Sequence, residues 1–178
     1  ARGNQAGAMA RAGQAVLLAD GAGCARHFAE ALATRGIVSL YGDALDAAVD
    51  DLREASQAVV DGDVGQSTWT RGWLAGALLR RGDAPGAHAE LRRLDPQTDG
   101  LPPEVVALVC GWDARLATLQ QDTQRAAFLL RHAAAAMRHA RALVLPVVAR
   151  VVEEAGLLES QTNVHRRRTR SPETPRAR

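Results

Sequence analysis

The chain has 178 residues, of which 47% are hydrophobic and only 3% aromatic, so it is expected to form one domain with a closely packed helical core rather than a disordered chain or a β-sandwich. All 22 basic residues are arginine and the formal net charge is +2, but residues 165–178 carry +5 and leave −3 for residues 1–164. The body therefore has no general attraction for nucleic acid, and no stretch reaches the roughly 20 apolar residues of a membrane span.

Along most of the chain, apolar residues return at steps of three and four, which is the pattern of amphipathic helices. One such stripe contains Leu45, Val49, Leu52 and Val59, with charged residues between them. In chain order, the pattern predicts helices over residues 6–19, 24–41, 44–60, 68–81, 84–94, 103–120, 123–142 and 145–158.

The breaks between these helices recur at a nearly fixed distance. Gly42, Gly82 and Gln121 each separate two predicted helices, and they are 40 and 39 residues apart. A helix pair of this length cannot bury its apolar face alone, so successive pairs are expected to stack. The sequence predicts an all-α domain over residues 1–164, built as a short solenoid of seven to eight helices in antiparallel pairs.

The second pair resembles a tetratricopeptide repeat. The matching residues are Ala75, Leu78, Gly82, Asp83, Ala87, Leu91 and Leu94. The segments Leu40-Tyr41-Gly42-Asp43 and Asp51-Leu52-Arg53-Glu54-Ala55 are similar to the degenerate repeats of large LuxR-type bacterial transcriptional regulators. The resemblance implies a scaffold or sensor region that lies between an ATP-binding module and a DNA-binding module, neither of which the sequence itself contains.

These features predict a non-catalytic module that binds a protein or peptide. Tryptophan is enriched in binding hot spots, and a repeat stack offers a concave face. The residues expected to line that groove are Trp73, Leu74, Trp112 and Arg115, although core packing is the competing interpretation for the tryptophans.

An alternative hypothesis is a nucleotide-binding enzyme. Residues 15–20 could form a strand that enters the Gly21-x-Gly23 turn, with a second strand at residues 37–41, and backbone N–H groups after the turn would then hold the pyrophosphate of NAD(P). Arg26 stands where a small residue is expected, and a lone glycine motif is a weak signal.

No other group of residues has the spacing of a catalytic or metal site. His132 and His139 are seven residues apart, or about 10 Å along a helix, which is too far for one metal ion. Cys24 and Cys110 are too few for a disulfide framework, which favours a reducing cytoplasm. We therefore expect a cytoplasmic protein with no cofactor, no metal and no enzymatic activity.

The segment 165–178 is rich in arginine and proline and is predicted to be a disordered basic tail. Its run Arg166-Arg167-Arg168 offers the chain's one plausible contact with nucleic acid, through phosphates and without sequence preference.

Overall fold

The computed structural model describes residues 2–59, 63–94, 100–140 and 145–170, and within these ranges α-helices joined by turns are the only regular secondary structure. This confirms the all-α prediction. The eight helices are α1 (Arg2–Gly21), α2 (Ala25–Tyr41), α3 (Leu45–Ala58), α4 (Val64–Arg81), α5 (Ala84–Arg92), α6 (Pro103–Leu119), α7 (Thr123–Met137) and α8 (Leu145–Arg170).

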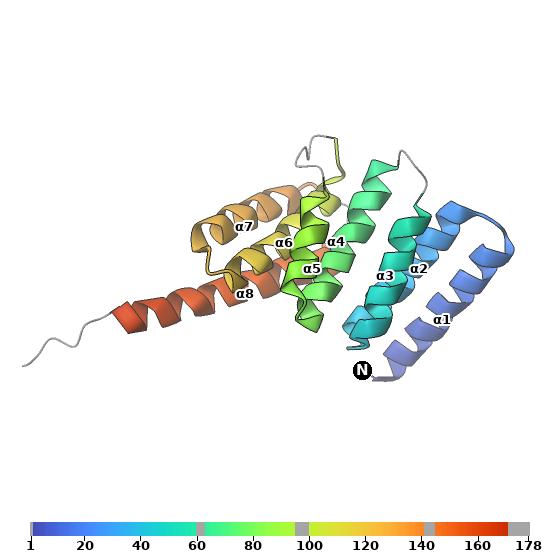
Figure 1. Cartoon of the computed structure of the whole chain (residues 1–178), viewed down its shortest axis with the longest axis horizontal. Coiled ribbons are helices and arrows are strands. Elements are labelled where there is room, and N and C mark those ends of the chain that lie inside the picture. Colours follow the sequence, from blue (N-terminus) through green and yellow to red (C-terminus); the bar gives the residue numbers. More distant parts are fainter. Residues whose placement is uncertain (1, 60–62, 95–99, 141–144, 171–178) are drawn as a thin grey trace, which may run out of the picture.

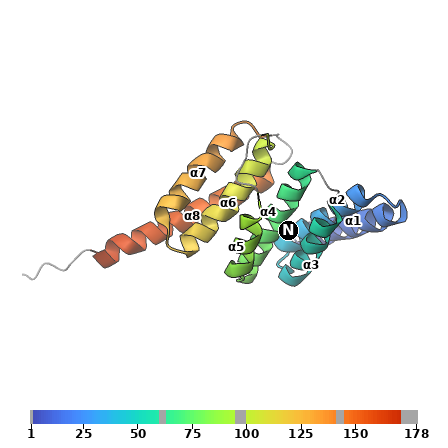
Figure 2. The same ribbon diagram turned by 45° about the horizontal axis from the view of Figure 1, so that its top comes forward.

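The helices follow one another side by side from α1 to α7, and α8 runs across α6 (Figures 1 and 2). Each helix packs against its neighbour in the chain, and the even-numbered helices α2, α4, α6 and α8 also contact one another in that order. Among the described residues, the odd-numbered helices make no contacts with one another. The even-numbered helices therefore form a continuous layer, which we call the inner layer.

The turns that end α2, α4 and α6 have the same geometry. Each turn contains one residue with a positive φ, in the left-handed region. These residues are Asp43 (φ 60°), Gly82 (φ 92°) and Gln121 (φ 62°), and successive ones are 39 positions apart. The following N–H donates to a carbonyl five residues back, as in a Schellman cap: Ala44 to Ser39, Asp83 to Leu78, and Asp122 to Ala117. The repeat predicted from the breaks is thus present in the backbone, with a regular period of 39.

Aspartate side chains begin three of the helices. An aspartate before the first turn accepts a hydrogen bond from an otherwise unpaired backbone N–H, which stabilises the helix start by about 1 kcal/mol. The pairs are Asp63 with the N–H of Gln66, Asp83 with that of Gly86, and Asp122 with that of Arg125.

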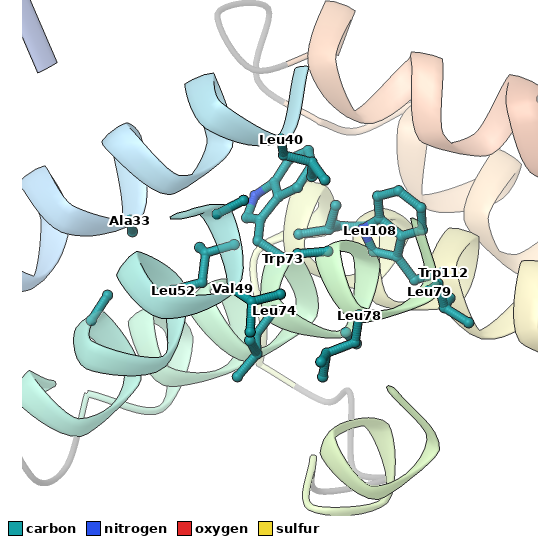
Figure 3. Packing of buried hydrophobic residues seen from close by; sticks show 14 of the residues in the cluster. Ala33, Leu40, Val49, Leu52, Trp73, Leu74, Leu78, Leu79, Leu108 and Trp112 are labelled. Carbon is teal, nitrogen blue, oxygen red and sulfur yellow. The ribbon is translucent and has the colours of Figure 1, made fainter. Parts of the chain in front are cut away.

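Small residues set the distance between the helices. Ala48, Ala87 and Ala126 are also 39 positions apart, and all three are completely buried. In the inner layer, Gly76 of α4 lies directly under the ring of Trp112 from α6, where any added Cβ would overlap the indole. The main core forms around these contacts, with Trp73 and Trp112 at its centre (Figure 3).

Four helix ends differ from the prediction by four residues or more. α1 begins at Arg2 rather than at residue 6, and α7 ends at Met137 rather than at residue 142. The other two differences have identifiable reasons. The start of α4 is at Val64 rather than residue 68, because Asp63 caps it there. The last helix was predicted to end near residue 158 but continues to Arg170, and the sequence has no proline between Pro146 and Pro172 to stop it. None of the described helices is long and apolar enough to cross a membrane.

Candidate functional site

Three of the four residues predicted to line a groove lie in the core instead. Trp73, Leu74 and Trp112 are buried, and Figure 3 shows the two indoles near Leu40 and Leu108 and all three side chains within the cluster of core residues. A partner cannot reach them in this conformation, so burial supports the competing interpretation of core packing. Only Arg115, whose side chain is 22% exposed, remains accessible.

The aromatic residues of the inner layer form a continuous row. Tyr41 of α2 meets Trp73 of α4 edge to face at 6.1 Å between ring centroids, and Trp73 meets Trp112 of α6 in the same way at 6.1 Å. Trp69 adds a third edge contact to Trp73 at 5.6 Å. Edge-to-face pairs add about 0.5 to 1.5 kcal/mol each beyond the burial of their area, so this row ties three inner helices together.

Two arginines cover the outer rings of this row. The guanidinium carbon of Arg150 lies 4.8 Å from the centroid of Tyr41, and that of Arg115 lies 5.8 Å from the centroid of Trp112. Both distances are within cation–π range. The two arginines share one carboxylate, since Glu154 lies 3.0 Å from Nε of Arg150 and 3.5 Å from Nη1 of Arg115.

A third arginine completes the polar surface beside Tyr41. Arg80 of α4 donates to the backbone carbonyl of Leu40 at 2.8 Å and to Asp43 at 2.7 Å. The carboxyl end of α2 favours a cation at this position. The charge of Arg80 opposes the rise that burial causes in the pKa of Tyr41, and it adds to the lowering that burial causes in the pKa of Arg115.

Burial is the largest influence on both of those groups. It raises the pKa of Tyr41, with Glu154 adding to the rise and Arg150 opposing it. For Arg115, burial lowers the pKa, and Glu154 only partly compensates. The Arg115 guanidinium is therefore poorly solvated, and the charge of Glu154 does not fully offset the effect of burial.

An open hollow of about 380 Å³ adjoins this surface. It brings together the first two helices and the start of α8, and its lining combines apolar side chains with two amides: Asn4, Gln5, Ala8, Ile37, Val38, Tyr41 and Val147. Gln5 is held in place by donating to the carbonyl of Val38 at 3.0 Å. We call this feature, together with Arg115, Arg150 and Glu154, the inner-layer site.

The nucleotide-binding alternative required strands that are not formed. Residues 15–20 lie in α1, Gly21 is its last residue, and residues 37–41 are the last turn of α2. Both predicted strands are therefore wrong. The turn at Ala22 and Gly23 instead links two helices that pack directly on each other. A shallow hollow does lie between them, lined by Ala15, Leu18, Ala19, Ala22, His27, Glu30, Ala31 and Thr34.

The remaining polar candidates are scattered. Within the described ranges, no three histidine, cysteine, aspartate or glutamate side chains are grouped in a way that could hold a metal ion. His132 stacks on Phe128 along the surface of α7. Both cysteines are free, and burial, aided by Asp113, raises the pKa of Cys110 to about 11.

The basic segment differs in part from its prediction. The backbone of residues 165–170 is the end of α8 rather than disordered tail. The side chains of Arg166, Arg167 and Arg168, and all of residues 171–178, lie outside the described part of the chain, so the predicted contact with nucleic acid stays a prediction.

Sequence reasoning identified Arg115 but missed its partners. Arg150 and Glu154 are four positions apart on one predicted helix, so their ion pair could have been predicted from the sequence. Their approach to Tyr41 and Trp112 depends on where α8 packs, and the helical pattern does not specify this. Comparison with known proteins adds nothing to the site, because no family model, no curated protein and no solved structure matches the chain.

Proposed function

We propose that the chain is a TPR-like solenoid that acts as a non-catalytic module for protein–protein interaction. The observation that carries this proposal is the 39-residue repetition of turn geometry at Asp43, Gly82 and Gln121, together with the buried alanines at the same spacing. Stacks of such helix pairs present long surfaces made of successive repeats, and proteins use these surfaces to bind other chains.

The inner layer is the side on which we place the partner. In a curved stack, the helices that contact one another lie at the smaller radius, so the layer of α2, α4, α6 and α8 is the concave one. Concave, largely apolar surfaces with a few fixed polar groups are the usual places for binding. The inner-layer site has this composition, with Ile37 and Val147 beside Gln5 and the arginines.

Within this role, the chain serves as the repeat region of a bacterial transcriptional regulator in the cytoplasm. The support is the resemblance of residues 40–43 and 51–55 to the repeats of LuxR-type regulators. An ATP-binding or DNA-binding module encoded in the same reading frame would support this assignment, and a coding sequence without either would count against it.

The binding role is tested by a matched pair of substitutions in α8. Val147 and Leu157 are both surface-accessible apolar residues, 36% and 64% exposed, but only Val147 lines the hollow. The tagged wild type, Val147→Glu and Leu157→Glu proteins would be used to purify partners from the host, with quantitative mass spectrometry as the readout.

We expect proteins that bind the wild type to be retained by Leu157→Glu and to be recovered in about 10-fold lower amount by Val147→Glu, because the added carboxylate occupies the hollow and pairs with Arg150 one helical turn away. Circular dichroism would establish that both variants keep the helical fold. If every bound protein responds equally to the two substitutions, the inner-layer site is not the binding surface.

A further inference from the structure

The two arginines of the inner-layer site have more hydrogen-bond donors than the protein uses. A guanidinium has five N–H donors in a planar fork. Arg150 donates through Nε to Glu154, and Arg115 makes only a 3.5 Å ion pair with the same carboxylate. Neither terminal group of Arg150, and no N–H of Arg115, is hydrogen-bonded to another described residue.

The charges around the site are also unbalanced. Arg80 is matched by Asp43 at 2.7 Å, whereas Arg115 and Arg150 share the single carboxylate of Glu154. Among the side chains that the structure describes, this leaves one excess positive charge next to an apolar hollow. The Arg115 side chain is only 22% exposed, and burial lowers its pKa because the charged form is poorly solvated. A second carboxylate beside it would stabilise that charged form.

The orientation of the arginines suits a planar acidic group. Arg150 lies over Tyr41 and Arg115 lies over Trp112, so stacking on the rings limits the positions that each guanidinium can adopt. Planar guanidinium groups fixed in this way bind carboxylates through paired hydrogen bonds, which a lysine cannot do. The Arg150 side chain, 60% exposed, is open to an incoming ligand.

We propose that Arg115 and Arg150 bind an Asp or Glu side chain of a partner peptide, and that a neighbouring apolar side chain of the same peptide enters the hollow formed by Ile37, Tyr41 and Val147. This inference rests on the proposed function and assigns the chemistry of its partner: an acidic residue next to a large apolar one. Glu154 then positions the two arginines, and their excess positive charge disfavours ligands that carry positive charge.

The test uses a displayed library of random 12-residue peptides selected on the full chain. We expect the selected peptides to be enriched in Asp or Glu beside Leu, Ile, Phe or Met. Isothermal titration of one selected peptide is expected to show binding that weakens with salt and becomes about 10-fold weaker in Arg115→Gln, because a charge-assisted hydrogen bond is lost. Replacing the peptide's acidic residue by its amide should weaken binding by a similar factor.

Two variants separate recognition from structural support. Arg131→Gln alters an exposed arginine of α7 and should leave the affinity unchanged, whereas Arg115→Lys keeps the charge and should retain part of the affinity. Selected peptides with no acidic enrichment, or equal losses in Arg115→Gln and Arg131→Gln, would overturn the inference.

The outcomes also distinguish this inference from the proposed function. The selected peptides could be neutral, bind Val147→Glu more weakly than the wild type and bind Arg115→Gln equally well. This result would support the interaction module but contradict the proposal of an acidic partner. Displacement of a selected peptide by an oligonucleotide at equal concentration would overturn the choice of a peptide ligand.

Discussion

The helix α4 at the centre of the stack and the helix α1 at its N-terminal edge both contain several glycines, but these glycines have different surroundings. In α4, Gly76 lies against Trp112, and Gly72 lies in contact with Leu108, so the absent side chains let two helices approach closely. In α1, Gly7 and Gly13 face nothing within 4 Å of where a Cβ would be. Glycine is therefore required for packing in α4, whereas in α1 it only lowers the helix propensity.

The number of neighbours explains the difference. The inner helix α4 packs against α2, α3, α5 and α6, whereas α2 is the only described helix that α1 packs against. Leu17 and Leu18 of α1 are consequently 74% and 75% exposed, while the leucines of α4 are buried. Burial, and with it stability, is therefore concentrated in the middle of the chain.

The largest effect is expected from Trp73→Ala at the centre. The substitution removes a fully buried indole and its edge contacts with three other rings, and it should lower the free energy of unfolding by about 3 to 5 kcal/mol. Urea denaturation followed by circular dichroism measures the change. At the edge, Leu17→Ala should change stability by less than about 0.5 kcal/mol, and comparable losses in the two variants would contradict the contrast.

Thiol labelling should show the same difference between the buried centre and the exposed edge, and it needs no substitution in the core. Burial raises the pKa of Cys110 from 9.0 to about 11, which by itself lowers its thiolate fraction about 100-fold at pH 8. Cys24 lies in the turn between α1 and α2 and is partly exposed. We expect Cys24 to react with a maleimide at least about 100-fold faster than Cys110, as measured by mass spectrometry of the peptides. Similar rates would show that α6 opens as readily as the edge.

A pair of glycine substitutions should give effects of opposite sign. Gly76→Ala places a methyl group into the ring of Trp112 and should cost about 1 to 3 kcal/mol despite the better helix propensity of alanine. Gly13→Ala meets no atom and should stabilise the protein by about 0.5 to 1 kcal/mol. Thermal unfolding of both variants gives the signs, and a gain in Gly76→Ala would contradict the close contact between α4 and α6.

Much of the fold could be predicted from the sequence because its signals are local. Gly82-Asp83 combines a residue that adopts the left-handed region with a residue that caps the next helix, and both roles are visible in the letters. The end of α8 could not be predicted in the same way, because a polar segment without glycine or proline is compatible with either helix or tail. Gln121, which adopts a positive φ without being glycine, was found through its spacing from Gly82.

The candidate site was less predictable, since it depends on packing between distant helices. A tryptophan on an amphipathic helix can face the core or a partner with the same local pattern, and Trp73 and Trp112 face the core. Arg115 follows Trp112 by three positions and so lies one turn along the same helix, which is why its place near the indole could be anticipated. The contribution of Tyr41, Arg150 and Glu154 required the structure.

Hydrogen exchange of the backbone amides, resolved by helix, tests the central claim that the chain is a stack with a protected inner centre and an open N-terminal edge. We predict that amides of α4 and α6 exchange only when the whole domain unfolds, and that those of α1 exchange about 100-fold or more faster through local opening. Equal protection of α1 and α4 would contradict the account.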